Sequence, residues 1–237
     1  MKKFLKLLMM ILFLFVSMLA KNIYKDNIAS AITVSKNILL DIPVIKQLPE
    51  YHNGCEATSL TMMLNYAGIK VDKATVVSKM KKDTTPIKRD STGKIIEWGN
   101  PQIGFVGDIT GKSPGYSIDP VALAPVIDYY LPGKTLDLTG CSYETLESTI
   151  SSGRPVAVWI TVYFNNPTFP HNWTSDGKVV KADFSQHAVL LTGMDEKSLY
   201  YNDPLSGAKK SKIDKTVFQS VWNKMGKKLY LTLSYNK

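Results

Sequence analysis

Cysteine and histidine, the residue types that most often carry nucleophilic chemistry, are scarce in this chain of 237 residues. The sequence holds the cysteines Cys55 and Cys141 and the histidines His52, His171 and His187. Imidazole accepts a proton near neutral pH, and a thiol becomes a strong nucleophile only as its thiolate. A cysteine activated by a histidine is therefore the chemistry that this composition favours.

Cys55 is the cysteine whose surroundings favour catalysis. The segment from Cys55 to Ala67 has apolar residues at helical spacing and Gly68 follows as a stop signal, so Cys55 is predicted to begin a helix. A helix N-terminus and a neighbouring imidazolium each stabilise a thiolate. Cys141 precedes a predicted helix cap at Ser142 and is predicted to be structural. A disulfide that joins the two cysteines is the alternative, because proteins outside the cytoplasm often pair theirs.

His187 is the histidine predicted to serve Cys55. It begins an apolar run that is typical of a strand, and the next predicted strand ends at Asn202 and Asp203. An imidazole needs an acceptor on its second nitrogen to hold its tautomer and orientation, and Asp203 is the predicted acceptor. Asn202 is the competing candidate for this role. Neighbouring strand residues face opposite sides, so only one of the two side chains can reach the ring. A buried structural histidine is the other interpretation of His187.

A thiol that attacks a carbonyl group forms an oxyanion, which needs hydrogen-bond donors. Gln47 lies just upstream of the predicted helix, so its side-chain amide and the Cys55 backbone N–H are the predicted donors. His52 and Cys55 have a spacing that metal ligands use, but no second Cys/His pair completes a site of four ligands. We therefore expect neither a metal nor a cofactor.

Helical patterns come first along the chain and strand patterns come second. A short edge strand is predicted at 39–45, followed by helices at 55–67, 72–81, 119–130 and 142–153. Strands are predicted at 155–164, 187–192, 199–201 and 228–234, with one late helix at 214–224. This order predicts an α+β fold with a helical lobe followed by an antiparallel β lobe, and a site in the cleft between them.

Two long segments, 83–117 and 164–183, show no periodicity. Loops of this length are usually functional or mobile, so we expect substrate specificity to reside in them. Trp98, His171 and Trp173 lie in these segments and are candidates for the substrate groove, with ordinary surface residues as the alternative.

The N-terminus predicts export. Lysines at 2, 3 and 6 precede a segment, 7–20, that is apolar except for Ser17, which is the pattern of a signal peptide. An uncleaved anchor is the second interpretation, since a membrane span needs about 20 apolar residues. We expect a signal peptide or anchor at 1–20, a linker at 21–38 and an extracytoplasmic catalytic domain at 39–237, secreted or tethered by its N-terminal segment.

The net charge is +9, and +6 without residues 1–20. The basic residues are scattered rather than gathered in a patch with interleaved aromatic residues, so nucleic acid is not an expected partner. A moderately basic surface suits polyanions of the cell wall or the membrane face. The sequence carries no signal for an oligomeric state.

At these residues the sequence resembles the papain-like cysteine peptidases, and within them family 39, the double-glycine leader peptidases and their stand-alone secreted relatives. The matching stretches are Ile42-Pro-Val-Ile-Lys-Gln47, Gly54-Cys-Glu-Ala-Thr-Ser-Leu-Thr-Met-Met-Leu-Asn-Tyr66, His187-Ala-Val-Leu-Leu-Thr-Gly193 and Tyr201-Asn-Asp-Pro204. They follow the family order Gln, Cys, His, Asp. The resemblance implies a papain-like fold with Gln47, Cys55, His187 and Asp203 in the roles described above.

The sequence therefore predicts an exported thiol hydrolase, a cysteine peptidase that cleaves a peptide or protein substrate through an acyl-enzyme on Cys55. A cell-wall amidase or acyltransferase that uses the same residues is one alternative. A catalytically silent binding module with this fold is the other.

Overall fold

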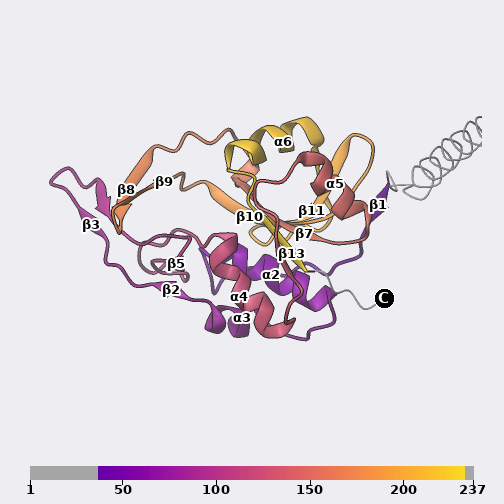
Figure 1. Ribbon diagram of the computed structural model, residues 1–237, viewed down its shortest axis with the longest axis horizontal. Coiled ribbons are helices and arrows are strands. Elements are labelled where there is room, and N and C mark those ends of the chain that lie inside the picture. Colours follow the sequence, from indigo (N-terminus) through magenta and orange to yellow (C-terminus); the bar gives the residue numbers. More distant parts are fainter. Residues whose placement is uncertain (1–36, 233–237) are drawn as a thin grey trace, which may run out of the picture. The chain divides into compact units, whose positions relative to one another are not determined.

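The computed structural model describes residues 37–232 of the chain (Figure 1). The predicted signal peptide or anchor at 1–20 lies outside the described residues, as do 21–36 of the predicted linker and the last residues, 233–237. Within 37–232, no helix combines the length and the apolar character that a membrane crossing needs.

A sheet of seven strands forms the centre of the fold. Its strands run in the order β12-β11-β10-β7-β13-β6, β1 also pairs with β10, and all neighbours are antiparallel. The strands are β1 (Ile38–Leu39), β6 (Thr135–Asp137), β7 (Val156–Thr161), β10 (Gln186–Met194), β11 (Ser198–Asn202), β12 (Ser211–Asp214) and β13 (Leu229–Thr232).

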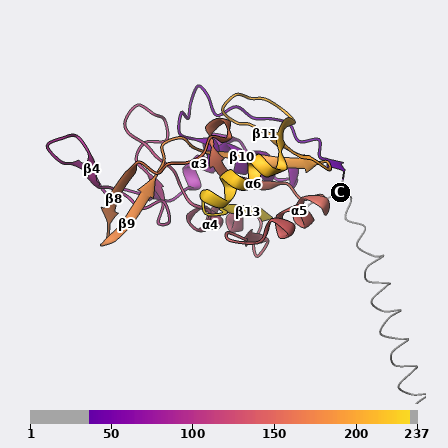
Figure 2. The ribbon, with the colours of Figure 1, turned by 90° about the horizontal axis from the view of Figure 1, so that it is seen from above.

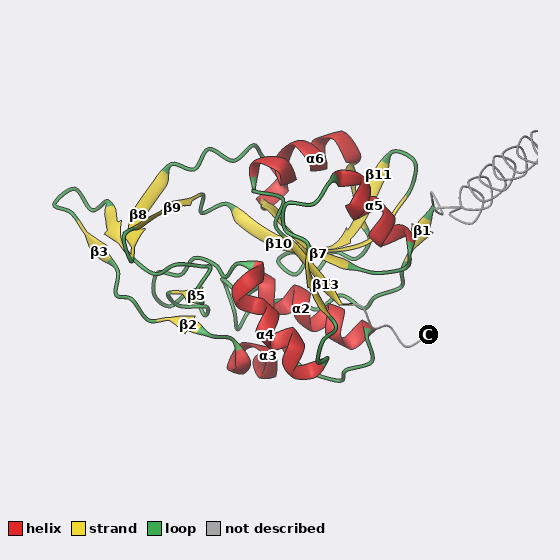
Figure 3. Ribbon diagram, viewed as in Figure 1, coloured by secondary structure: helices red, strands yellow, loops and turns green. Residues whose placement is uncertain are grey.

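Helices cover both faces of this sheet (Figure 3). On one face lie α2 (Cys55–Tyr66), α3 (Lys73–Lys79) and α4 (Pro120–Tyr130), and on the other lie α5 (Tyr143–Ser151) and α6 (Lys215–Lys224). Successive strand residues point to opposite faces, so each central strand supplies both cores. In β7, Trp159 packs on the α2 side, whereas Val158 and Ile160 pack on the α6 side. Every residue of β7 is buried for this reason.

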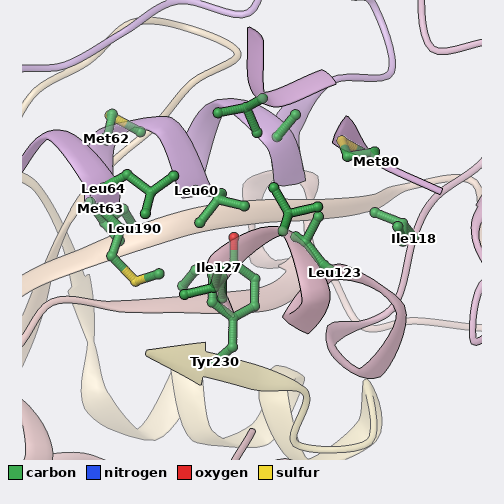
Figure 4. Packing of buried hydrophobic residues seen from close by; sticks show 14 of the residues in the cluster. Leu60, Met62, Met63, Leu64, Met80, Ile118, Leu123, Ile127, Leu190 and Tyr230 are labelled. Atoms are coloured by element: carbon green, nitrogen blue, oxygen red, sulfur yellow. The ribbon is translucent and has the colours of Figure 1, made fainter. Parts of the chain in front are cut away.

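The core on the α2 side holds the first catalytic candidate in place. Leu190 and Tyr230 of the sheet meet Leu60 of α2 and Leu123 and Ile127 of α4 there (Figure 4). Residues 55–64 of α2 are all buried, so this helix is enclosed rather than amphipathic. Its N-terminus is therefore fixed by packing on all sides.

The segment 83–117, predicted to be a loop, contains short strands instead. They are β2 (Lys82–Asp83), β3 (Lys88–Arg89), β4 (Ile95–Glu97) and β5 (Phe105–Val106). The second unpatterned segment, 164–183, forms the hairpin of β8 (His171–Ser175) and β9 (Lys178–Ala182). Strands of two or three residues are too short for a periodic signal, which is why the sequence did not predict β2 to β5.

These two segments join in one sheet of four strands, in the order β3-β4-β8-β9, which we call the arm (Figures 1 and 2). Glu97 of β4 pairs with Thr174 of β8 in parallel register. The arm has its own small core, which includes Ile95, Trp98 and Trp173. Parts of the two segments expected to select substrate thus form one structural unit, while β2 and β5 pair in a separate sheet of two strands.

The α+β class is confirmed, and so are most helix starts. Asp72 and Ser142 cap α3 and α5 by accepting hydrogen bonds from backbone N–H groups in the first turn. The strand predicted at 39–45 is wrong beyond Leu39, because the chain leaves the sheet and buries Ile42 in the core on the α2 side. Asp119 precedes α4 as expected, but its side chain pairs with Lys228 instead of capping the helix.

Candidate active site

The loop before α2 places Cys55 at the first position of the helix. Gly54 is the N-cap residue, its N–H donates to Tyr51 O, and its own carbonyl accepts from Thr58 N. A side chain on Gly54 would collide with the Cβ atom of Tyr51, so only glycine permits this close approach. The thiol of Cys55 is consequently buried where α2 begins.

The immediate contact of the thiol is a carboxylate. Cys55 Sγ donates to Glu56 Oε2 at 3.3 Å. Burial raises the pKa of the Cys55 thiol well above its usual value, and the charge of Glu56 raises it further, while the backbone N–H of Ala188 acts to lower it. The effect expected from the helix N-terminus is therefore outweighed, because desolvation disfavours the thiolate.

His187 lies in β10, which packs against α2. Its strand pairs with β7, where Ile160 is the partner of His187, so the ring is carried by the rigid centre of the sheet. His187 Nε2 is 2.8 Å from Asp203 Oδ1, and the histidine is only 5% exposed. With Nε2 engaged by Asp203, Nδ1 is the ring nitrogen left for a thiol proton.

Asp203 is strongly held in its ionised form. Burial acts to raise its pKa, but hydrogen bonds from His187 and Ser206 outweigh burial and lower the pKa to about 2. Ser206 Oγ donates to Oδ2 at 2.6 Å, and Leu205 N donates to Oδ1 at 2.9 Å. The turn after β11 thus fixes the carboxylate that faces the imidazole.

The competing side chains are engaged elsewhere. Asn202 is fully buried on the other side of the strand, where its Nδ2 donates to Ile42 O at 2.8 Å. Asp195 Oδ2 accepts from Tyr200 OH at 2.8 Å and pairs with Lys212. Neighbouring strand residues point to opposite faces, which explains why Asn202 and Asp203 have different partners.

Gln47 is buried, with 2% of its surface exposed. Its Nε2 donates to His52 O at 2.8 Å, which orients the amide and leaves the second N–H of that group available. Among the described residues its Oε1 has no hydrogen-bond partner. The backbone of Gln47 also donates to Pro204 O at 2.9 Å, directly after Asp203.

Two contacts bring together the chain segments that carry the four residues predicted for the site. One is the bond from the Gln47 backbone to the turn of Asp203. The other is the packing of α2 on β10, where the backbone N–H of Ala188 faces the Cys55 sulfur and Ser59 Oγ donates to Ala188 O at 3.3 Å.

The prediction that the two tryptophans line the substrate groove is wrong. Trp98 and Trp173 are buried in the core of the arm with ring centroids 5.4 Å apart, and Trp173 Nε1 donates to Gly99 O. His171 is exposed at the base of the arm, where its ring lies 4.7 Å from that of Phe184. Of the three, only His171 is therefore at the surface.

The sequence interpretation missed a buried polar network beside the thiol. Glu56 Oε1 accepts from Ser117 Oγ at 2.6 Å, and Gln186 Nε2 donates to the same Ser117 oxygen. Tyr116 OH in turn donates to Gln186 Oε1 at 3.2 Å. The sequence offered one signal for it: Glu56 is the one charged residue in the helix from Cys55 to Tyr66.

Next to this site, the loop 107–115 packs against the segment that precedes α2. Asn53 N donates to Ile109 O at 3.0 Å, and Asn53 Nδ2 donates to Asp108 O at 2.8 Å. The two segments border an open depression of about 400 Å³, lined by Pro49, Glu50, His52, Thr110, Gly111 and Lys112.

Comparison with known proteins identifies similar chains. A model of the Peptidase_C39 like family matches residues 39–230. The uncharacterized protein YvpB of Bacillus subtilis (strain 168) is 35% identical over 189 residues, which are 79% of this chain and 72% of that protein. The crystal structure of a proposed C39-like peptidase from Bacillus anthracis has a TM-score of 0.76 and 34% identity, and the match covers 86% of this chain and 100% of the other.

Proposed function

This chain belongs to the Peptidase_C39 like family, and from that premise we propose that it is a cysteine peptidase that cleaves peptide bonds through an acyl-enzyme on Cys55. The observation that carries the proposal is the 2.8 Å contact between His187 and Asp203, on the strand that packs against the helix of Cys55. Nucleophile, base and orienting acid are the parts that such chemistry requires.

In this mechanism His187 Nδ1 takes the proton from Cys55 Sγ, and the thiolate attacks the carbonyl carbon of the scissile bond. The imidazolium then gives that proton to the leaving amine, and the thioester forms. A water molecule, deprotonated by His187, hydrolyses the thioester. Asp203 accepts the Nε2–H bond throughout, so it holds the tautomer and stabilises the imidazolium.

Gln47 and the backbone N–H of Cys55 are the proposed oxyanion donors. Cys55 is the first residue of α2, and the N–H groups of the first turn of a helix have no partner within that helix. Gln47 supports this role through the bond from Nε2 to His52 O, which orients its second N–H. Donors held in this way need no reorganisation when negative charge develops.

We assign substrate selection to the arm and to the aromatic residues at its base, Phe184, Tyr116 and His171. Phe184 is 44% exposed and makes edge contacts with Tyr116 and His171, at centroid distances of 5.4 and 4.7 Å. It precedes His187 by three residues along the chain. An exposed aromatic surface on the segment that leads into the strand of His187 suits an apolar substrate side chain.

Hydrolysis of a diverse peptide mixture by the purified protein, read by mass spectrometry, tests the proposal. We expect cleaved bonds with the wild type and none with Cys55→Ala or His187→Ala, while Cys141→Ser behaves as the wild type. Release of products from cell-wall fragments with intact peptides would favour the amidase or acyltransferase. If Cys55→Ala kept the peptide hydrolysis or the cell-wall activity of the wild type, that result would contradict a role of this thiol.

We also propose that the protein acts outside the cytoplasm, on peptide or protein substrates. The charge pattern of residues 1–20 supports export.

A further inference from the structure

Glu56 and Gln186 are the chain neighbours of the two principal catalytic candidates, and Ser117 joins them. Ser117 Oγ donates to Glu56 Oε1 at 2.6 Å and accepts from Gln186 Nε2. Gln186 directly precedes His187 in β10, and Glu56 directly follows Cys55 in α2. The network therefore connects the helix of the nucleophile to the strand of the base through one hydroxyl group.

Glu56 is 1% exposed, and its carboxyl group has no lysine, arginine or histidine partner in any ion pair of the described residues. An unpaired buried carboxylate is costly and persists only where hydrogen bonds satisfy it. Side-chain donors do so here, Ser117 Oγ at Oε1 and Cys55 Sγ at Oε2 at 3.3 Å, together with the backbone N–H groups of Glu56 and Ile118. Burial raises the pKa of the Glu56 carboxyl group above its usual value, while these hydrogen bonds act to lower it and so favour the ionised carboxylate that accepts the thiol proton.

We propose that Glu56 is a positioning residue that holds the Cys55 thiol protonated in the resting enzyme, with Ser117 and Gln186 fixing its carboxylate relative to the strand of His187. This inference rests on the proposed role of Cys55 as the nucleophile. The thiol proton lies on the bond from Sγ to Glu56 Oε2. Catalysis requires that bond to break and the same proton to pass to His187 Nδ1, so Glu56 competes with the base.

The consequence is a nucleophile that stays unreactive until substrate binding favours transfer to His187. A thiol reacts with oxidants and electrophiles far more slowly than a thiolate. The other titratable groups that face Glu56 are Tyr230 of β13, whose OH donates to Glu56 O at 3.3 Å, and Tyr116 of the loop before Ser117. Both phenols are neutral near pH 7, and burial raises their pKa values further above the usual one.

The test measures the rate at which iodoacetamide alkylates Cys55 in the folded protein between pH 5 and 10, in a Cys141→Ser background. In Glu56→Gln the acceptor charge is gone while the shape is kept, so the thiolate forms more easily. We expect alkylation at pH 7 to be about tenfold faster or more, with the pH profile moved to lower pH. Glu50→Gln, which removes an exposed carboxylate, is the matched control and leaves the profile unchanged.

Ser117→Ala supplies an independent variant. It removes a donor that lowers the pKa of Glu56, so the carboxyl group stays neutral to higher pH and its charge acts on the thiol over a narrower pH range. We expect faster alkylation than in the wild type at low and neutral pH, and a return to the wild-type rate at high pH, where Glu56→Gln stays faster. A purely structural disturbance would expose the thiol and accelerate the reaction by the same factor at every pH in both variants, and this result would overturn the proposal.

Equal or slower alkylation of Glu56→Gln at every pH would also overturn it. Peptide hydrolysis by the wild type, measured alongside, separates this inference from the proposed function. Hydrolysis with an unchanged Glu56→Gln profile refutes only the role of Glu56. Faster alkylation of Glu56→Gln without hydrolysis of any peptide supports the role of Glu56 and refutes peptidase activity.

Discussion

The imidazole of His187 and the carboxylate of Asp203 meet at 2.8 Å although 16 residues separate them in the chain. The hairpin of β10 and β11 brings them together, and its register pairs Leu190 with Asn202. Asp203 therefore lies just beyond the last paired residue, at the end of the hairpin where His187 stands.

Replacement of Asp203 tests this relationship. We expect Asp203→Ala to lower kcat by more than about tenfold, because the imidazole loses the acceptor that holds its tautomer. Asp203→Asn retains part of the activity, since an amide oxygen still accepts from Nε2. Steady-state hydrolysis of a cleaved peptide measures both variants. Asp195→Ala is the control, and a greater loss there than in Asp203→Ala would contradict the assignment.

Asp203 also makes stability depend on pH. Its folded-state pKa of about 2 is below the usual 3.8, so its contribution is present above pH 4 and is lost as pH falls through 2. Allowing for solvent screening of a partly exposed group, the contribution is about 1–2 kcal/mol. As pH is lowered from 6 to 2, the midpoint temperature of thermal unfolding should therefore fall more steeply in the wild type than in Asp203→Asn. Parallel curves would contradict this.

Removal of the proposed oxyanion donor should slow chemistry without weakening binding. We expect Gln47→Ala to lower kcat by about 10²–10³ with little change in KM, because the donor acts on charge that appears only in the transition state. Gln102→Ala, at an exposed glutamine, is the control and should match the wild type. A change confined to KM would place Gln47 in substrate binding instead.

The two cysteines are free thiols, Cys55 buried and Cys141 partly buried. Alkylation under denaturing conditions without reductant should therefore add two labels to the purified protein. Cys141→Ser should keep full peptidase activity, because burial raises the pKa of Cys141 and no catalytic candidate adjoins it in the chain. A mass two units lower with no label would reveal a disulfide and contradict this prediction.

The proposed export predicts the location of the catalytic domain and the N-terminal residue of the mature protein. Fractionation should recover the domain outside the cytoplasm. Two cleavage sites are candidates: Ala20 ends the apolar segment, and Ala29-Ser30-Ala31 has the small-residue pattern of a cleavage site. Mass spectrometry of the N-terminus distinguishes cleavage after Ala20 or Ala31 from an uncleaved anchor. Recovery of the domain in the cytosol would refute the prediction.

Local patterns were enough to predict the elements that carry the candidate site. The helix at Cys55 follows from apolar residues at helical spacing and a terminal glycine, and the strand at His187 from a short run of β-branched and apolar residues. Hydrogen bonds from side chain to backbone at Asp72 and Ser142 act over three residues, so their caps were also predictable. These signals depend on neighbours in the chain.

Only the tertiary structure decided the features that depend on distant residues. The arm forms when β4 meets β8, and the pairing of Glu97 with Thr174 leaves no trace in strands this short. The burial of Trp98 and Trp173 follows from that pairing. The raised pKa of the Cys55 thiol depends likewise on desolvation and on Glu56, because the cost of a buried charge is set by everything packed around it.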